Sequence, residues 1–133
     1  MATRSFIGIL NKDDSVDYIY CHWDGYVAGV GKVLQEHYTS EKKIDKLLAL
    51  GDISSLGPKI GRKHAFDNYD IARDNGWTTA YGRDRGEDCV DPHIHEGPKK
   101  WMNDRRGNGC EYAYIWDGTK WGGYNLWTNG EVL

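Results

Sequence analysis

Several stretches of the sequence combine residue types that can carry chemistry. The first, residues 81–88, reads Tyr-Gly-Arg-Asp-Arg-Gly-Glu-Asp and alternates cations with carboxylates between glycines that permit sharp backbone turns. Tyr81, Arg83, Asp84, Arg85 and Glu87 are therefore candidates for an acid–base site or for an arginine site that binds an anion. The alternative is a salt-bridged surface loop, in which each exposed pair contributes about 0 to 1 kcal/mol.

A second candidate lies further on, where His93 and His95 flank a single residue. In an extended segment both imidazoles point to the same side, and Cys89, Asp91 or Glu96 would complete a set of metal ligands. The spacing matches no established zinc pattern, so solvated histidines in a polar loop are the alternative. We predict metal binding by His93 and His95, and the identity of any cofactor is left open.

A third stretch, residues 25–33, follows an apparent strand and opens a helix, as a phosphate-binding loop does. Five residues separate Gly25 from Gly31, where the motif has four, and Val33 replaces the hydroxyl residue that binds magnesium. These departures argue against an ATPase and favour glycines that serve close packing. A looser binding site around this loop stays open. Its candidate residues are Trp23, Asp24, Tyr26 and Lys32.

A fourth candidate is Trp101, which the sequence surrounds with cations, namely Lys99, Lys100, Arg105 and Arg106. An aromatic ring among cations can bind a nucleotide or a single nucleic-acid strand. Equally, Trp101 can belong to the core with the cations solvated around it.

The cysteines offer no further site, because Cys21, Cys89 and Cys110 cannot all pair within the chain and their spacing matches no zinc or redox motif. Cys21 and His22 are neighbours in a predicted strand and face opposite ways, which speaks against a simple nucleophile and base. Reduced thiols and a cytoplasmic location are expected.

Composition limits the classes of protein that these residues can belong to. The 133 residues fit one domain, 1–133, and 6 Trp with 9 Tyr supply an aromatic-rich core. A net charge of −3 argues against broad capture of nucleic acid, for which a strongly basic face is expected. No apolar run approaches the length needed to span a membrane, so no membrane partner is expected.

Apolar alternation predicts a β-hairpin near each end of the chain. Residues 5–10 and 16–22 form the first, with Val16 and Tyr18 on one face of the second strand and Ile19 on the other. Residues 111–116 and 119–121 form the second, joined by Asp-Gly at 117–118, a pair typical of a type I′ turn. A further strand is expected at 124–128.

Helical spacing predicts two central helices and a shorter third one. The first covers residues 27–37. The second follows the hydroxyl cap candidates Thr39 and Ser40 and ends before Gly51. Residues 51–76 are expected to be irregular, residues 77–82 to form a strand, and residues 98–106 to form a short helix begun by proline. The predicted fold is an α+β single domain with a mostly antiparallel sheet and two central helices.

Four motifs taken together resemble a family of small uncharacterised proteins encoded by bacteriophages and prophages. They are Tyr-Cys-His-Trp-Asp-Gly-Tyr at 20–26, Val-Gly-Lys-Val-Leu at 30–34, Leu-Gly-Asp-Ile-Ser-Ser-Leu-Gly at 50–57 and Ala-Tyr-Gly-Arg-Asp-Arg-Gly-Glu at 80–87. The resemblance spans about residues 1 to 90. It implies expression in the cytoplasm of an infected bacterium and transfers no catalytic residue.

These observations lead us to expect a phage accessory protein that acts by binding, and that inhibits a bacterial host or anti-phage defence protein. One alternative is sequestration of a small nucleotide signal, with Lys32, Arg83 or Arg85 on the phosphates. Another is a small metal-dependent hydrolase or nuclease that uses Asp84, Glu87, His93 and His95. A homo-oligomer is left open.

Overall fold

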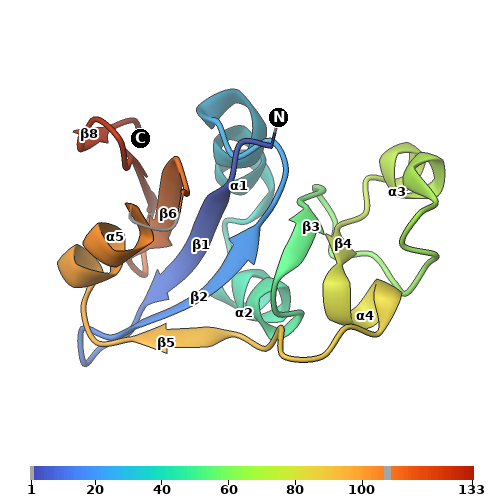
Figure 1. Ribbon diagram of the computed structural model, residues 1–133, viewed down its shortest axis with the longest axis horizontal. Helices are drawn as coiled ribbons and strands as arrows, with labels where there is room; N and C mark the ends of the chain where they lie inside the picture. Colours follow the sequence, from blue (N-terminus) through green and yellow to red (C-terminus); the bar gives the residue numbers. More distant parts are fainter. Residues whose placement is uncertain (1, 107–108) are drawn as a thin grey trace.

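An eight-stranded sheet forms the centre of the structure, a computed structural model that describes residues 2–106 and 109–133 (Figure 1). The strands are β1 (Ser5–Leu10), β2 (Val16–Cys21), β3 (Ile53–Ser55), β4 (Thr79–Ala80), β5 (His93–His95), β6 (Tyr112–Trp116), β7 (Trp121–Asn125) and β8 (Gly130–Glu131). The helices are the π-helical turn η1 (Val27–Gly31), then α1 (Lys32–His37), α2 (Glu41–Ala49), α3 (Tyr69–Asn75), α4 (Tyr81–Arg85) and α5 (Pro98–Arg106).

The strands lie in the order β4-β3-β2-β1-β6-β7-β8, and β5 pairs with β2 beside this path. Most of the pairs are antiparallel. Two parallel pairs, β1 with β6 and β2 with β3, join the N-terminal hairpin to the C-terminal hairpin and to the middle of the chain. The predicted fold class, α+β with a mostly antiparallel sheet, is confirmed.

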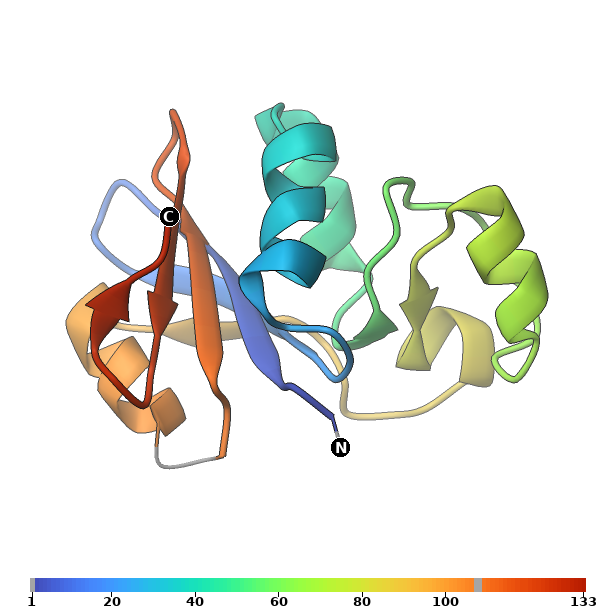
Figure 2. The same cartoon turned by 90° about the horizontal axis from the view of Figure 1, so that it is seen from above.

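Helices cover both faces of the sheet, as Figure 2 shows for α1 and α2 on one side and α5 on the other. The α1 and α2 face buries Ile19 of β2 against Leu34 and Leu47 of the two helices. The α5 face buries Tyr18 of the same strand against Trp101. The predicted alternation of β2 is therefore confirmed, with neighbouring residues in separate cores.

The predicted C-terminal hairpin exists, but its turn is longer than Asp-Gly alone. Trp116 is paired with Trp121, so four residues connect the strands. The Asp117 carboxylate accepts the N–H groups of Thr119 (2.8 Å) and Lys120 (2.9 Å), which stabilises this longer loop without a type I′ turn. The strand expected at 124–128 is likewise corrected, because β7 begins at Trp121 and ends at Asn125.

Both central helices form where the sequence predicts them, although the first begins with the π-helical turn η1 before α1. The Ser40 hydroxyl caps α2 by accepting the N–H of Lys43 (3.3 Å), and Gly51 follows the helix with a φ of 76°. Helix α5 covers the predicted residues 98–106.

The middle of the chain departs most from the prediction. Residues 51–76 contain β3 and α3, and the strand expected at 77–82 is reduced to Thr79–Ala80, after which the chain turns into α4. Among the described residues of α3 only Ala72 is buried, so the helix has no apolar stripe that a sequence pattern can detect. We call residues 53–86 the α3 lobe; it extends from the β2 side of the sheet (Figure 1).

Candidate binding site

The loop that follows β2, residues 22–26, is fixed by backbone hydrogen bonds to two other segments. The N–H of Trp23 donates to the carbonyl of Ser54 (3.0 Å), and the N–H of Gly25 donates to the carbonyl of Thr3 (2.8 Å). A Cβ at Gly25 would lie 2.7 Å from the Thr3 oxygen, so this approach requires glycine. The loop therefore presents its side chains from a fixed backbone.

Trp23 is 44% exposed, and its indole contacts the edge of the His22 ring with centroids 4.7 Å apart. Burial lowers the pKa of His22, and nearby Arg4 lowers it further, so the imidazole is neutral at pH 7. The Tyr20 hydroxyl lies 2.7 Å from His22 Nδ1, and burial raises the pKa of Tyr20 to about 12. A hydrogen bond thus joins the protonated tyrosine to the neutral histidine and fixes the position of the ring beside Trp23.

Asp24 occupies the left-handed backbone region, with a φ of 57°. Few residues other than glycine adopt this conformation, and aspartate is among those that tolerate it. The Asp24 carbonyl accepts the N–H of Val30 (2.8 Å), and a Cβ at Gly29 would lie 2.3 Å from that carbonyl oxygen. The glycine at 29 therefore serves close packing of the loop on η1, as the sequence predicted for this stretch.

A pocket of about 270 Å³, which we call the aromatic pocket, lies between this loop and the α3 lobe. It is lined by Trp23, Asp24, Ser54, Ser55, Tyr69 and Thr79. Tyr69 is the first residue of α3 and is 66% exposed. Tyr26, 43% exposed, donates its hydroxyl to the Asp24 carboxylate (3.3 Å) and so adjoins the pocket. Three exposed aromatic side chains therefore gather at one place.

A second pocket, of about 290 Å³, lies next to the aromatic pocket and shares Ser55, Tyr69 and Thr79 with it. Its other walls come from the segment after β3, from α3 and from Trp77. The two pockets form a groove between β3 and α3. We call it the α3 groove, and Tyr69 stands at its middle.

Two residues of the predicted acid–base cluster turn out to organise the backbone beside this groove. The carboxylate of Asp84, which is 8% exposed, accepts the N–H groups of Ala80 (2.8 Å) and His64 (3.1 Å). Arg83 donates to Asp84 and to the carbonyls of Ile60 (2.9 Å) and Thr78 (2.6 Å). Both side chains thus have partners within the fold, and ligand binding by Arg83 and Asp84 stays a prediction.

Burial alone would raise the pKa of Asp84, but Arg83 and the two backbone N–H donors outweigh it and hold the pKa below its ordinary value. The carboxylate is therefore ionised at neutral pH. The His64 imidazole, also buried, lies within hydrogen-bond distance of the Thr79 hydroxyl through Nε2 (3.1 Å). This network sets the position of Thr79, which lines both pockets.

The other members of the predicted cluster lie on the surface of α4 and just beyond it. Arg85 forms an ion pair with Glu87, and its guanidinium lies over the rings of Phe66 (4.5 Å) and Tyr81 (4.9 Å). Burial raises the pKa of Tyr81, although a hydrogen bond with Ser54 opposes this. The arginine is thus already paired and stacked within the chain.

Lys32 and Trp101 lie away from the aromatic pocket. Lys32 is an exposed residue at the start of α1 and does not line the pocket. Trp101 is 0% exposed and belongs to the core between α5 and the sheet. This burial agrees with the alternative that places Trp101 in the core, because a helix that covers a sheet face buries its largest apolar side chain there. Binding by Trp101 stays a prediction.

His93 and His95 lie on β5, opposite Tyr18 and Val16 of β2. Each imidazole faces a different carboxylate: His93 Nε2 lies 3.3 Å from Asp52, and His95 Nε2 lies 2.7 Å from Asp104. Within residues 2–106 and 109–133, no group of three or more His, Cys, Asp and Glu side chains is placed to hold a metal ion. Metal binding by His93 and His95 stays a prediction.

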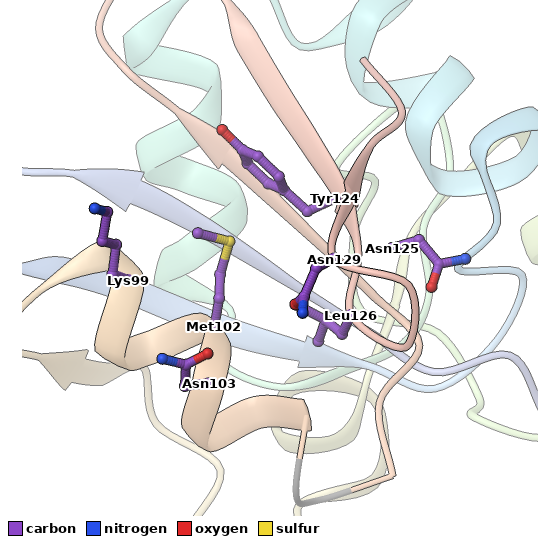
Figure 3. A pocket seen from close by; sticks show the side chains of 7 residues that line it. All are labelled: Lys99, Met102, Asn103, Tyr124, Asn125, Leu126 and Asn129. Atoms are coloured by element: carbon purple, nitrogen blue, oxygen red, sulfur yellow. The ribbon is translucent and has the colours of Figure 1, made fainter.

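A further pocket, of about 400 Å³, lies between α5 and the β7–β8 hairpin (Figure 3). It is lined by Lys99, Met102, Asn103, Tyr124, Asn125, Leu126 and Asn129. Lys99 borders this pocket, whereas Trp101 is buried in the core.

The sequence identified one side of the aromatic pocket, Trp23 and Asp24 with the adjoining Tyr26, and missed the other. Ser54, Ser55, Tyr69 and Thr79 come from the α3 lobe, in which the sequence predicted only the strand around Thr79–Ala80. A weak signal existed at Asn68, whose carboxamide caps α3 by accepting the N–H of Ile71 (3.1 Å). This cap would have placed Tyr69 at the start of a helix.

Comparison of the chain with models of protein families, with curated proteins and with solved structures found no match. Across the part of the chain that the structure describes, none of the helices has the length and apolar character needed to cross a membrane.

Proposed function

We propose that the chain acts by binding a protein partner at the aromatic pocket and the α3 groove. The observation that carries this proposal is that the exposed Trp23 and Tyr69 line one pocket, while the exposed Tyr26 is hydrogen bonded to Asp24 of the same lining. Tryptophan and tyrosine are enriched among the residues that dominate binding energy at protein interfaces. Three such side chains at one place therefore support a docking surface.

The rigidity of the surface supports the same proposal. Residues 22–26 are held by hydrogen bonds to Thr3 and Ser54, and Tyr69 stands on a capped helix. Side chains that are already ordered lose little conformational entropy when a partner binds. The position of the surface on loops, supported by a sheet and helices, is typical of binding sites.

The setting that we propose is the cytoplasm of an infected bacterium, as the resemblance of the four motifs to phage-encoded proteins implies. The partner would be a host or anti-phage defence protein, and one copy of the chain would inhibit it by occupying its surface. Sequestration of a nucleotide receives less support, because Arg83 and Arg85 have partners within the chain and the aromatic pocket is lined by a carboxylate.

The experiment that tests this is capture of partners from bacterial lysate by the tagged full chain, followed by native mass spectrometry of the complexes. We compare the wild-type chain with the double variant Trp23→Ala, Tyr69→Ala. The control is Trp127→Ala, which removes a tryptophan that is more exposed than Trp23 (63% against 44%) from the turn between β7 and β8. The α3 lobe, which carries Tyr69, lies at the end of the molecule opposite β8, so the control changes a distant surface (Figure 1).

We expect one protein at a fixed stoichiometry with the wild type and with Trp127→Ala. The double variant should bind it at least about 30-fold more weakly, which is the loss of about 2 kcal/mol expected from a single hot-spot residue. Equal capture by the double variant would contradict the proposal. A nucleotide mass in the spectrum would favour the sequestration alternative, and a metal mass would favour the hydrolase.

A further inference from the structure

We propose that the aromatic pocket receives an arginine side chain of the protein partner, with its guanidinium against the Asp24 carboxylate. This inference rests on the proposed function and specifies the chemistry by which the partner is recognised. It starts from the lining of the pocket, which combines two exposed aromatic rings with one carboxylate and three hydroxyl side chains.

The charge of the pocket favours a cationic occupant. Asp24 is the ionisable acid among the lining residues, and no lysine or arginine lines the pocket. Among the described residues, none forms an ion pair with Asp24. A phosphate or carboxylate placed here would face a like charge, whereas a cation would gain an unpaired partner and the faces of Trp23 and Tyr69.

The geometry of the lining favours arginine over lysine. A guanidinium is planar, stacks on aromatic rings and presents five N–H donors in a fixed fork. Asp24 can accept two of these, and the hydroxyl oxygens of Ser54, Ser55 and Thr79 offer further acceptors. An ammonium group has three donors around a point charge and no plane that can stack.

The carboxylate of Asp24 is available because the fold holds this residue by its backbone. The carbonyl accepts the N–H of Val30, and the residue keeps a φ of 57°, where glycine would be less strained. Its carboxylate accepts a hydrogen bond from Tyr26, whose side chain is itself exposed. One hydrogen bond from Tyr26 leaves the Asp24 carboxylate with further acceptor positions, which the fixed backbone presents to an incoming guanidinium.

The test is titration of the ¹⁵N-labelled full chain with N-acetylarginine amide. Binding is measured from the chemical-shift changes of the protein's backbone amide and indole signals. N-acetylcitrulline amide is the matched neutral probe, because it has the same shape without the charge, and N-acetyllysine amide tests the guanidinium plane. The matched variants are Asp24→Asn and Asp45→Asn, the latter removing the same charge from an exposed position on α2.

We expect the arginine probe to shift signals of Trp23, Ser55 and Tyr69, with citrulline at least fivefold weaker and lysine intermediate. Asp24→Asn should weaken arginine binding at least fivefold, and Asp45→Asn should leave it unchanged. An equal response to citrulline, an unchanged response in Asp24→Asn, or shifts confined to other elements would overturn the inference.

The outcome is separable from that of the proposed function. One outcome is that the double variant Trp23→Ala, Tyr69→Ala no longer captures the partner, while Asp24→Asn binds the partner with wild-type affinity. The arginine inference is then overturned and the docking surface stands. If the arginine probe binds through Asp24 but the double variant captures the partner as well as the wild type, the docking proposal fails. The arginine-binding pocket is then retained.

Discussion

Asp84 lies among alternating charges that resemble a catalytic cluster, yet its surroundings define a different role. Its carboxylate accepts two backbone N–H groups from separate segments, at His64 and Ala80, and pairs with Arg83. A buried carboxylate with these donors stays ionised and ties the chain together, as its lowered pKa indicates. Removal of the Asp84 charge should therefore lower the stability of the fold rather than remove a direct contact with a partner.

We predict that Asp84→Asn lowers the free energy of unfolding at pH 7 by about 2 to 3 kcal/mol, because hydrogen bonds to a charged group are lost and Arg83 is left unpaired. The folded-state pKa of Asp84 lies below the ordinary value of 3.8, so its stabilisation is full above that value and is lost as the pH falls below it. The difference between wild type and variant should shrink in acid.

Urea unfolding followed by far-ultraviolet circular dichroism, from pH 7 down to pH 2.5, measures both effects. Asp45→Asn on the exposed face of α2 is the control for removal of a charge. A difference between wild type and Asp84→Asn that stays constant over this range would show that the Asp84 charge does not stabilise the fold.

Trp101 supplies a second prediction for a single residue. Its ring is fully buried and lies 5.5 Å from the ring of Tyr18, so Trp101→Phe leaves a cavity in the α5 core. We expect a loss of about 2 kcal/mol of stability, less than for truncation to alanine, and unchanged capture of the partner.

Trp23→Phe should show the reverse, with stability within about 0.5 kcal/mol of wild type and weaker capture of the partner. Thermal unfolding and the capture assay measure both.

Among the secondary-structure elements, those that the sequence predicted share a strong local pattern. Alternation sends Val16 and Ile19 to opposite cores, and α2 combines a buried Ile44 and Leu47 stripe with a hydroxyl cap. The elements of the α3 lobe lack such patterns, because β3, β4 and α4 are two to five residues long and α3 is polar. Their conformations depend on distant contacts, such as those of Asp84, which a local pattern does not contain.

The cap of α2 gives a prediction for an element. Both Thr39 and Ser40 were candidates in the sequence, and the structure assigns the cap to Ser40, whose hydroxyl accepts the N–H of Lys43. Ser40→Ala should lower stability by about 1 kcal/mol, and Thr39→Ala should change it by less than about 0.5 kcal/mol. Chemical denaturation of the two variants side by side tests this. Equal losses would show that the hydroxyl contributes little to the helix.

On the scale of the whole molecule, the candidate site depends on how the α3 lobe is joined to the sheet. Trp23 stands on the loop after β2, and Tyr69 stands on the lobe, so the distance between them changes if the lobe moves. Besides the pairing of β3 with β2, the lobe meets the body at Tyr38, whose hydroxyl donates to the Gly57 carbonyl (2.7 Å) while its own carbonyl accepts from Trp121 Nε1 (2.8 Å). This buried tyrosine is thus one of the contacts that join the lobe to the end of α1 and to β7.

We therefore predict that Tyr38→Phe loosens the lobe without unfolding the sheet. Loss of one buried hydrogen bond costs about 1 kcal/mol, which corresponds to about fivefold faster amide exchange where the lobe opens. The amides of Lys59 and Thr78, which bond within the lobe, should show this increase in hydrogen–deuterium exchange, and those of β1 and β6 should not. Partner affinity should change by less than about twofold, because an opening that remains rare leaves nearly every molecule with an intact α3 groove. Uniformly faster exchange across the sheet would instead assign Tyr38 to global stability.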